Sequence, residues 1–285
     1  MDQQIINLYD EYTHKPLTRE EFLSRLKILV GGTLAATAIL PFLENNYAAA
    51  AVTSENELFT EYAAFPGVPN EMKAYLARPE KQARYPAIIV IHENRGLNAH
   101  IEDVARRAAR EGYLAIAPNV LSSLGKTPAN EDEARSWFQE LKPDDSLQNF
   151  INAFEYVKSR PDCNGNIGCI GFCWGGAMAN NMAVNVPGLM AAVAFYGMQP
   201  PSADVPKIKA ALQLHYAGLD DRVNAGITAY EAALKQNNIT YEQFIYEGVN
   251  HAFHNDTSPT RYNEEAAKLA WKRSMEFFEK YLMKI

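Results

Sequence analysis

Short apolar runs and amphipathic stretches alternate along the chain from Leu58 onward. Ala87–Ile91 is rich in β-branched residues, a pattern typical of a strand that is buried on both faces of a sheet. Ile101–Glu111 carries apolar residues at helical spacing and is followed by Gly112, a residue type that commonly ends helices. The same criteria predict strands at Leu58–Phe65, Glu71–Ala77, Ala87–Ile91, Tyr113–Pro118, Ile167–Phe172, Ala191–Tyr196, Ala210–Tyr216 and Tyr241–Tyr246. They predict helices at Ile101–Glu111, Asn130–Leu141, Ser146–Arg160, from Trp174, near Ala225–Gln236 and at Asn263–Leu282.

The order of these elements predicts the fold class. A Pro-Gly-Val-Pro-Asn turn separates the first two strands, which indicates an antiparallel hairpin. The later strands alternate with helices, and this alternation produces a mostly parallel sheet covered by helices on both faces. We find no internal repeat or flexible linker in residues 56–285 and predict a single α/β domain there.

Residues 1–55 have a different composition and form a separate segment. The apolar stretch Ile28–Leu43 contains two glycines and a proline, and it is shorter than the about 20 apolar residues that a membrane-spanning helix needs. Followed by the small residues Ala48–Ala51, it is compatible with the core and cleavage site of a signal peptide. The alternative is an amphipathic arm, Glu20–Val30, followed by an apolar helix that packs on the domain.

The export interpretation is weakened by the residues before the apolar stretch. Thr18–Ser24 resembles a twin-arginine export motif, but Glu20 stands where the second arginine belongs. Asp10, Glu11 and Glu21 add acidic residues that such signals avoid. We therefore favour a retained helical arm and a cytoplasmic protein over a cleaved leader and a periplasmic one.

Composition narrows the class of protein. The chain has 285 residues, a net charge of −7, 47% hydrophobic and 21% charged residues, which is ordinary for a globular protein and unlike a disordered chain. It lacks the basic patches that nucleic acids bind, so we expect no nucleic-acid partner. Three cysteines are too few for a disulfide framework, and at least one thiol stays unpaired.

Cys173 is the strongest chemical signal in the sequence. It lies in Gly171-Phe-Cys-Trp-Gly-Gly176, after an apolar strand and before a helix-compatible run. Glycines at this spacing allow the sharp strand-to-helix turn that presents a nucleophile, here with cysteine in the usual serine position. The helix N-terminus then favours the thiolate. Cys163 and Cys169 lack such surroundings, and we interpret them as buried structural residues.

A nucleophile needs a base, and the base needs an acid that orients it. Ala210–Tyr216 is followed by Asp220 and Asp221, at the strand end where parallel sheets place active sites. We favour Asp220 as the acid, because Asp221 is placed to cap the next helix. The base is expected at His251, after the strand Tyr241–Tyr246, with His254 as its rival.

The remaining histidines and the first loop complete the candidate set. His14, His100 and His215 lack a comparable context, and we expect them to be structural or exposed. The backbone N–H groups of Asn94 and Trp174 are placed to form an oxyanion hole. A metal site made of His92, Glu93, His251 and His254 has no convincing ligand spacing, so we predict no metal.

Together these motifs resemble the dienelactone hydrolases, which have an α/β-hydrolase fold. The resemblance covers about residues 60–283 and is carried by His92-Glu-Asn-Arg-Gly-Leu-Asn98, Gly171–Gly176, Phe195-Tyr-Gly197, Gly218-Leu-Asp-Asp-Arg-Val223 and Asn250-His-Ala-Phe253. It implies a triad of Cys173, Asp220 and His251. It also implies that Glu93 keeps the resting thiol protonated and takes part in its activation, although Glu93 could instead pair with Arg95 or a lysine.

The chain departs from the family where substrate is bound. The resemblance implies arginines that hold a substrate carboxylate, but those positions carry Asn255 and Glu131 here. Arg95 and Arg135 are candidate replacements, and Tyr196 is a further candidate substrate contact. On these departures we predict that neutral esters or lactones are better substrates than carboxylated ones.

The sequence therefore predicts hydrolysis of a small carboxylic ester or lactone through an acyl-cysteine intermediate, without a cofactor. A phosphotriester or thioester hydrolase on the same scaffold is the first alternative. The second is a non-enzymatic thiol sensor or binding protein, which the order of the triad residues argues against.

Overall fold

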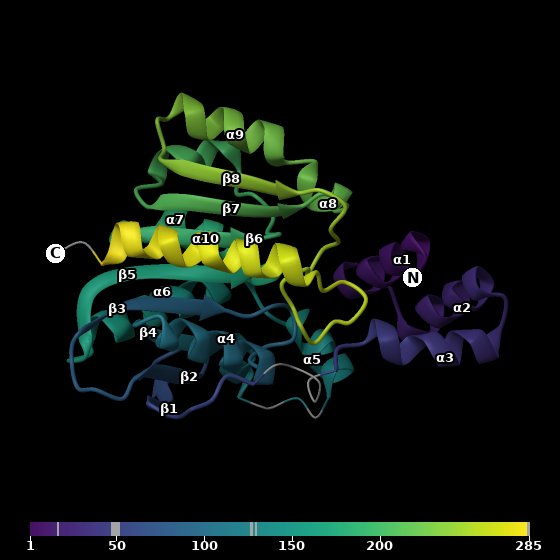
Figure 1. Cartoon of the computed structure of the whole chain (residues 1–285), viewed down its shortest axis with the longest axis horizontal. Coiled ribbons are helices and arrows are strands. Elements are labelled where there is room, and N and C mark those ends of the chain that lie inside the picture. The colour runs from purple at the N-terminus through teal and green to yellow at the C-terminus, as the bar shows by residue number, and fades with distance from the viewer. Residues whose placement is uncertain (16, 47–51, 126–127, 129, 284–285) are drawn as a thin grey trace.

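The computed structural model describes residues 1–15, 17–46, 52–125, 128 and 130–283. The strands in this part of the chain form one eight-stranded sheet in the order β1-β2-β4-β3-β5-β6-β7-β8 (Figure 1). The strands are β1 (Leu58–Phe65), β2 (Met72–Pro79), β3 (Tyr85–Ile91), β4 (Leu114–Asn119), β5 (Cys163–Phe172), β6 (Ala191–Phe195), β7 (Ala211–Ala217) and β8 (Tyr241–Tyr246). β2 pairs antiparallel with β1 and β4, and the other pairs are parallel. The predicted hairpin and mostly parallel sheet are confirmed.

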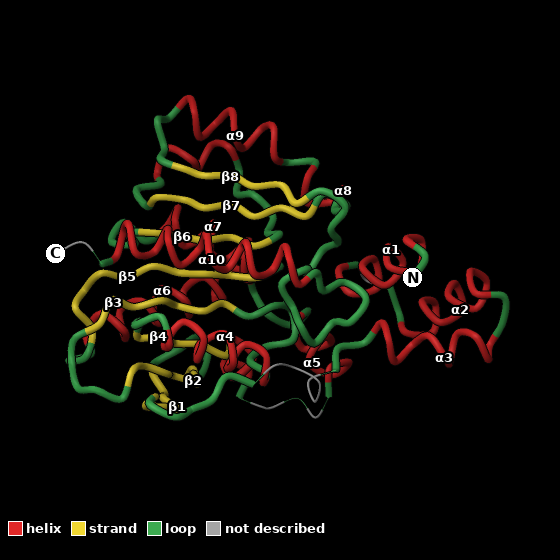
Figure 2. Tube along the Cα trace, viewed as in Figure 1, coloured by secondary structure: helices red, strands yellow, loops and turns green. Residues whose placement is uncertain are grey.

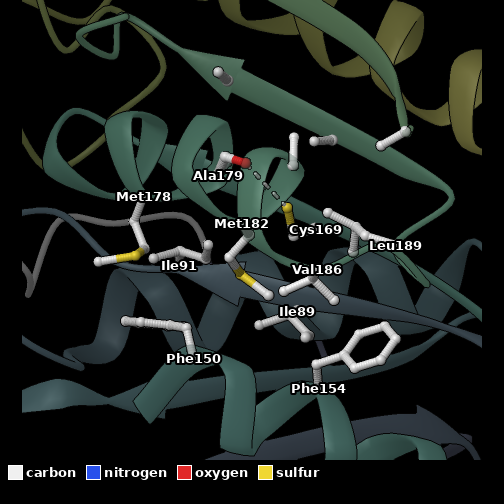
Figure 3. Close-up of a cluster of buried hydrophobic side chains, with 14 of the residues drawn as sticks. Ile89, Ile91, Phe150, Phe154, Cys169, Met178, Ala179, Met182, Val186 and Leu189 are labelled. Atoms are coloured by element: carbon white, nitrogen blue, oxygen red, sulfur yellow. Dashed lines mark hydrogen bonds between the residues drawn. The ribbon is translucent and has the colours of Figure 1, made fainter. Parts of the chain in front are cut away.

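Helices cover both faces of the sheet (Figure 2). One face carries α4 (Ala99–Arg110) and α10 (Glu264–Leu282), and the other carries α6 (Pro143–Ser159), α7 (Trp174–Asn185) and α9 (Ile227–Gln236). Each layer encloses a hydrophobic core. In the α6–α7 layer, Ile89 and Ile91 of β3 face Phe150, Phe154 and Met182 (Figure 3).

Short elements connect these layers on the way to the site. They are the 3₁₀ helices η2 (Val120–Leu124) and η3 (Ser202–Lys207) and the helices α5 (Glu131–Phe138) and α8 (Asp221–Asn224). The sequence did not predict α8, because its four residues are too few to show helical periodicity. β5 begins at Cys163, earlier than predicted, because its first residue pairs with Tyr85 ahead of a register shift.

The helices α1 (Gln3–His14), α2 (Arg19–Val30) and α3 (Thr33–Leu43) form a helical arm. A small core holds the three helices together and consists of Ile5, Leu8, Tyr9, Tyr12, Leu17, Phe22, Leu26, Ala36 and Leu43. Thr18 and Glu21 form a capping box at the start of α2, so the residues that resemble an export motif act as a helix N-terminus here. α1 was not predicted from the sequence, and the expected small-residue cleavage segment Ala48–Ala51 lies outside the described residues.

The arm packs at the edge of the sheet toward which the parallel strands point (Figure 1). Asn94 Nδ2 donates to the Thr13 carbonyl at 2.7 Å, and Arg135 Nη1 donates to the Tyr12 carbonyl at 2.8 Å. No single helix in the described part of the chain is long and apolar enough to cross a membrane. α2 and α3 meet the length and composition criteria only as a pair bent by 113°.

Candidate active site

The register of the sheet brings the loops of the candidate site together. Ile91 of β3 pairs with Gly171 of β5, Phe172 of β5 pairs with Phe195 of β6, and Ala217 of β7 pairs with Tyr246 of β8. The strands therefore end at one edge, and the residues just beyond their ends meet there. This edge is where open parallel sheets place their ligand sites.

Cys173 occupies the turn between β5 and α7. Its φ of 57° and ψ of −113° lie in a region that residues with a side chain rarely adopt. The turn depends on its glycines, because a Cβ on Gly171 would collide with the Gly175 carbonyl and one on Gly175 with the Ile91 carbonyl. The strained elbow predicted from the sequence is therefore present.

The surroundings of Cys173 favour its thiolate. Burial opposes the charge, but the imidazoles of His14 and His251 lower the pKa of the thiol to about 6. Burial instead raises the pKa values of Cys163 and Cys169, which lie in the hydrophobic core of the α6–α7 layer. Of the three thiols, Cys173 alone has the electrostatic environment of a nucleophile.

Asp220 and His251 form a buried pair beside the elbow. His251 Nδ1 lies 2.5 Å from Asp220 Oδ2, and both side chains are almost fully shielded from solvent. Asp220 Oδ1 accepts from the Val223 N–H at 3.2 Å and so caps α8. Asp221 was expected to cap the next helix, and that expectation is wrong: Asp221 is the exposed first residue of α8, and Asp220 both caps the helix and contacts the imidazole.

The other downstream histidines have different positions. His254 stacks on Phe172, with ring centroids 4.9 Å apart, and burial lowers its pKa well below the ordinary value. His215 is buried between aromatic rings, and His100 Nδ1 lies 2.9 Å from Asp256 Oδ1. His100 and His215 are structural, as expected, and the stacked ring of His254 has no contact with the nucleophile among the described interactions.

A cavity of about 370 Å³ borders the nucleophile. It is lined by Thr13, His14, Lys15, Asn94, Arg135, Phe138, Gln139, Cys173, Trp174, Ala177, Tyr196, Met198 and Arg222. The backbone N–H groups of Asn94 and Trp174 have no hydrogen-bond partner among the described residues, so both can donate to an oxyanion. A larger cavity, beside α10, contains no candidate nucleophile.

Glu93 is buried close to the nucleophile. Its Oε2 accepts from Asn255 Nδ2 at 2.7 Å, and its Oε1 is buried without a hydrogen-bond partner. Glu93, Cys173 and His251 line one small cavity of about 20 Å³. Asn255 is fully buried. Asn255, at the position where the resemblance implies an arginine, therefore bonds to Glu93 and is not among the residues that line the 370 Å³ cavity.

Some of the candidate substrate contacts line the 370 Å³ cavity, and others lie outside it. Tyr196 lines the 370 Å³ cavity, and its buried ring lies 4.9 Å from the ring of His251. Arg135 lines the cavity too, but its Nη1 donates to carbonyls of the arm. Arg95 bonds to Asn94 and lies outside that cavity. Arg222 was not predicted from the sequence; it lines the 370 Å³ cavity and has two buried guanidinium nitrogens that lack hydrogen-bond partners.

His14 was expected to be structural or exposed, and that expectation is wrong. Its Nε2 lies 3.1 Å from Cys173 Sγ, and its ring meets that of His251 edge-on at 4.7 Å. Its other ring nitrogen, Nδ1, lies 2.8 Å from the Asp10 carbonyl oxygen and 3.2 Å from Asp10 Oδ1. The apolar spacing Ile5-Leu8-Tyr9-Tyr12 could have revealed α1, but no local pattern indicates where this helix docks.

The four residues considered for a metal site are not brought together. His92 Nδ1 lies 2.6 Å from the Glu93 carbonyl oxygen and its Nε2 accepts from the Val120 N–H, so both ring nitrogens are engaged. In the described part of the chain, the ligand-type atoms that cluster are those of His14, Cys173 and His251, all within 4.8 Å of one another.

Comparison with known proteins finds similarity over most of the chain. The model of the "Dienelactone hydrolase family" matches residues 72–282. A "Putative carboxymethylenebutenolidase" of Saccharolobus solfataricus is 32% identical over 74% of this chain and 94% of its own length. The "Putative hydrolase fragment YghX" of Escherichia coli K12 is 44% identical over 39% of this chain and 98% of its own length.

Solved structures show the same relationship. The crystal structure titled "Putative Dienelactone Hydrolase" from Klebsiella pneumoniae is 28% identical, covers 79% of this chain and 99% of that one, and superposes with a TM-score of 0.70. The arm helices α1–α3 precede the residues that the family model matches. From Met72 to Leu282, the chain belongs to the dienelactone hydrolase family of α/β-hydrolases.

Proposed function

We propose that the protein hydrolyses a small carboxylic ester or lactone through an acyl-cysteine intermediate on Cys173. The observation that supports this most directly is that the elbow thiol lies beside the buried His251–Asp220 pair and borders one cavity together with the residues that carry the two unpartnered backbone N–H groups. Membership of a hydrolase family that acts on ester and lactone bonds agrees with it.

In the first half of the reaction, the Cys173 sulfur attacks the substrate carbonyl carbon. The carbonyl oxygen becomes negative and is stabilised by the N–H groups of Asn94 and Trp174, which are oriented before substrate arrives. Collapse of this intermediate breaks the bond to the leaving oxygen and leaves the acyl group on sulfur. In the second half, water loses a proton to His251, attacks the thioester and releases the acid and the thiolate.

Asp220 keeps the His251 ring in the tautomer that this sequence of steps needs, with Nδ1–H toward the carboxylate and Nε2 free. Glu93 has an unpartnered buried oxygen next to the same residues and is our candidate for modulating the thiol.

The test is a substrate panel combined with trapping of the intermediate. We expect turnover of p-nitrophenyl carboxyl esters, little turnover of the matching phosphate esters, and an acyl group on Cys173 by mass spectrometry of the quenched enzyme. Cys173→Ala should be inactive. Cys163→Ser, at a thiol outside the site, serves as the matched control and should remain active. Preferred turnover of phosphotriesters or of thioesters would contradict the proposed substrate class, and a reactive Cys173 without any turnover would favour a thiol sensor.

A further inference from the structure

The arm places a second imidazole on the nucleophile. His14 is the last residue of α1, and its Nε2 approaches Cys173 Sγ to 3.1 Å. As in His251, one nitrogen of the His14 ring faces the sulfur, but the other, Nδ1, lies 2.8 Å from a backbone carbonyl oxygen, that of Asp10, with a carboxylate close beside it. This carboxylate also belongs to Asp10, one helical turn earlier on α1, with its Oδ1 3.2 Å from Nδ1.

This position is held by contacts between the arm and the hydrolase domain. Carbonyls at the end of α1 accept from Asn94 and Arg135, and the Arg135 guanidinium stacks on the Tyr12 ring at 4.0 Å. At the start of α1, Gln3 Nε2 donates to Asn250 Oδ1 at 2.6 Å. Both ends of α1 are therefore tied to the loops that carry the site.

The cavity distinguishes the two imidazoles. The 370 Å³ cavity is bordered by Cys173, by both candidate oxyanion donors and by His14, whereas His251 is not among its lining residues. His251 instead lines two smaller cavities that His14 also borders. The imidazole that a substrate in the large cavity meets is therefore that of His14.

We propose that His14 of the arm is a second catalytic imidazole, which protonates the leaving group while Asp10 orients it. This inference rests on the proposed ester hydrolysis and assigns one of its proton transfers. Burial opposes charge on the His14 ring, but the Cys173 thiolate and the Asp10 carboxylate raise its pKa, so the ring is suited to carry the proton.

The protons balance over the cycle. The S–C bond forms as the thiolate attacks, and the C–O bond to the leaving group breaks as that oxygen takes the proton from His14 Nε2. His251, which is protonated in the resting thiolate–imidazolium pair, then passes its proton to the neutral His14, since their ligand-type ring atoms and the sulfur lie within 4.8 Å of one another. Water gives a proton to the neutral His251, its oxygen bonds to the acyl carbon, and the C–S bond breaks to release the thiolate.

The test uses the full-length chain and two esters with the same acyl group. The p-nitrophenyl ester releases p-nitrophenolate, a leaving group that departs without a proton. The ethyl ester releases ethoxide, which needs a proton to depart. Loss of a general acid costs about 10²- to 10⁴-fold. We therefore expect His14→Gln to lower kcat/KM for the ethyl ester at least about 100-fold, and for the p-nitrophenyl ester by less than about tenfold.

Two further variants complete the design. Asp10→Asn should show the same selective loss, smaller in size, and Gln4→Ala, at an exposed position of the same helix, should behave as wild type. Added imidazole should restore ethyl ester hydrolysis in His14→Ala, which a merely structural residue would not allow. Thermal melting checks that each variant is folded.

Equal losses on both esters, no loss, or a faster His14→Gln enzyme would overturn the proposal. These outcomes differ from failure of the proposed function itself, in which the wild-type protein would hydrolyse neither ester and Cys173→Ala would change nothing.

Discussion

Asp220 contacts His251 with one carboxylate oxygen and caps α8 with the other. Oδ2 lies 2.5 Å from His251 Nδ1, and Oδ1 accepts from the Val223 N–H at 3.2 Å. The same residue therefore fixes the start of a helix and the orientation of the imidazole. Its pKa is lowered even though burial opposes ionisation, because the His251 contact stabilises the carboxylate.

Because Asp220 makes both contacts, we expect three substitutions to differ in their effects on activity and stability. Asp220→Asn keeps a capping oxygen but loses the tautomer control, so kcat should fall on the order of 10⁴-fold with little change in stability. Asp220→Ala should lose the activity and also about 1 kcal/mol of stability through the missing cap. Asp221→Asn, the matched control, should retain most of the activity. Ester kinetics and urea denaturation measure both effects, and equal activity losses at the two positions would contradict the assignment.

Thiol reactivity should single out Cys173. With its pKa lowered to about 6, most of this thiol is thiolate at pH 7, which differs from the protonated resting thiol that the family resemblance implies and follows from the two neighbouring imidazoles. Burial instead raises the pKa values of Cys163 and Cys169. Iodoacetamide labelling followed by peptide mapping should find Cys173 modified first, with a rate that rises through pH 6. His14→Gln removes a positive neighbour and should move that midpoint upward. Initial modification of Cys163 or Cys169 would count against the site.

The pH profile of kcat/KM should be bell-shaped. The active ion pair needs the Cys173 thiolate, which forms above about pH 6, and the His251 imidazolium. Burial opposes charge on the ring, but Asp10, the thiolate and Asp220 raise the pKa of His251 to about 10. Because Asp10 contributes to this rise, Asp10→Asn should shift the alkaline limb to lower pH. An alkaline limb at the ordinary histidine value in the wild type would contradict the ion pair.

The charge of the cavity favours the opposite substrate preference to the one expected from the sequence. Lys15, Arg135 and Arg222 line it, and none of the described lining residues is a carboxylate. Two nitrogens of Arg222 are buried without hydrogen-bond partners, and its Nε lies 3.8 Å from Asp10 Oδ2. An anionic substrate would complete these contacts.

We therefore expect esters that carry a carboxylate to exceed neutral analogues at least about tenfold in kcat/KM, equivalent to about 1.4 kcal/mol of transition-state binding. Arg222→Met should remove the preference, whereas Arg95→Met, outside the cavity, should keep it. Paired kinetics on a lactone with and without its carboxylate measure the ratio, and a preference for the neutral compound would restore the original prediction.

Zinc inhibition tests whether the three side chains meet in solution. His14, Cys173 and His251 offer two imidazoles and a thiolate, which are preferred zinc ligands, and the carboxylates behind both rings are typical of such sites. We expect Zn²⁺ to inhibit at micromolar concentration, EDTA to reverse the inhibition, and Mg²⁺ to have no effect. His14→Gln should weaken inhibition at least about tenfold, since it removes one ligand. Equal inhibition of both proteins would place the metal elsewhere.

The parts of the site that lie within the matched domain were accessible from sequence. Cys173, Asp220 and His251 each follow a strand, so their chain order and the parallel topology suffice to bring them to one edge. The roles of Asp220 and Asp221 were harder to separate. Adjacent aspartates before a helix have the same local pattern, and only the direction of each side chain decides which one caps.

His14 and Asn255 depend on tertiary placement that no local pattern encodes. His14 reaches the site because a helix outside the matched residues docks through contacts with Asn94 and Arg135, far away in sequence. Asn255 lies where a substrate contact was expected, yet its amide turns inward to Glu93. In both cases the partner residue is set by the packing of separate segments.

The docking of α1 also bears on protein engineering. The residues matched by the family hold the proposed nucleophile, acid and base, so substitutions in the arm can alter the charge and the walls of the candidate site while Cys173, Asp220 and His251 stay unchanged. The three arm helices are thus a part of the molecule, separate from the proposed triad, through which the surroundings of Cys173 can be modified.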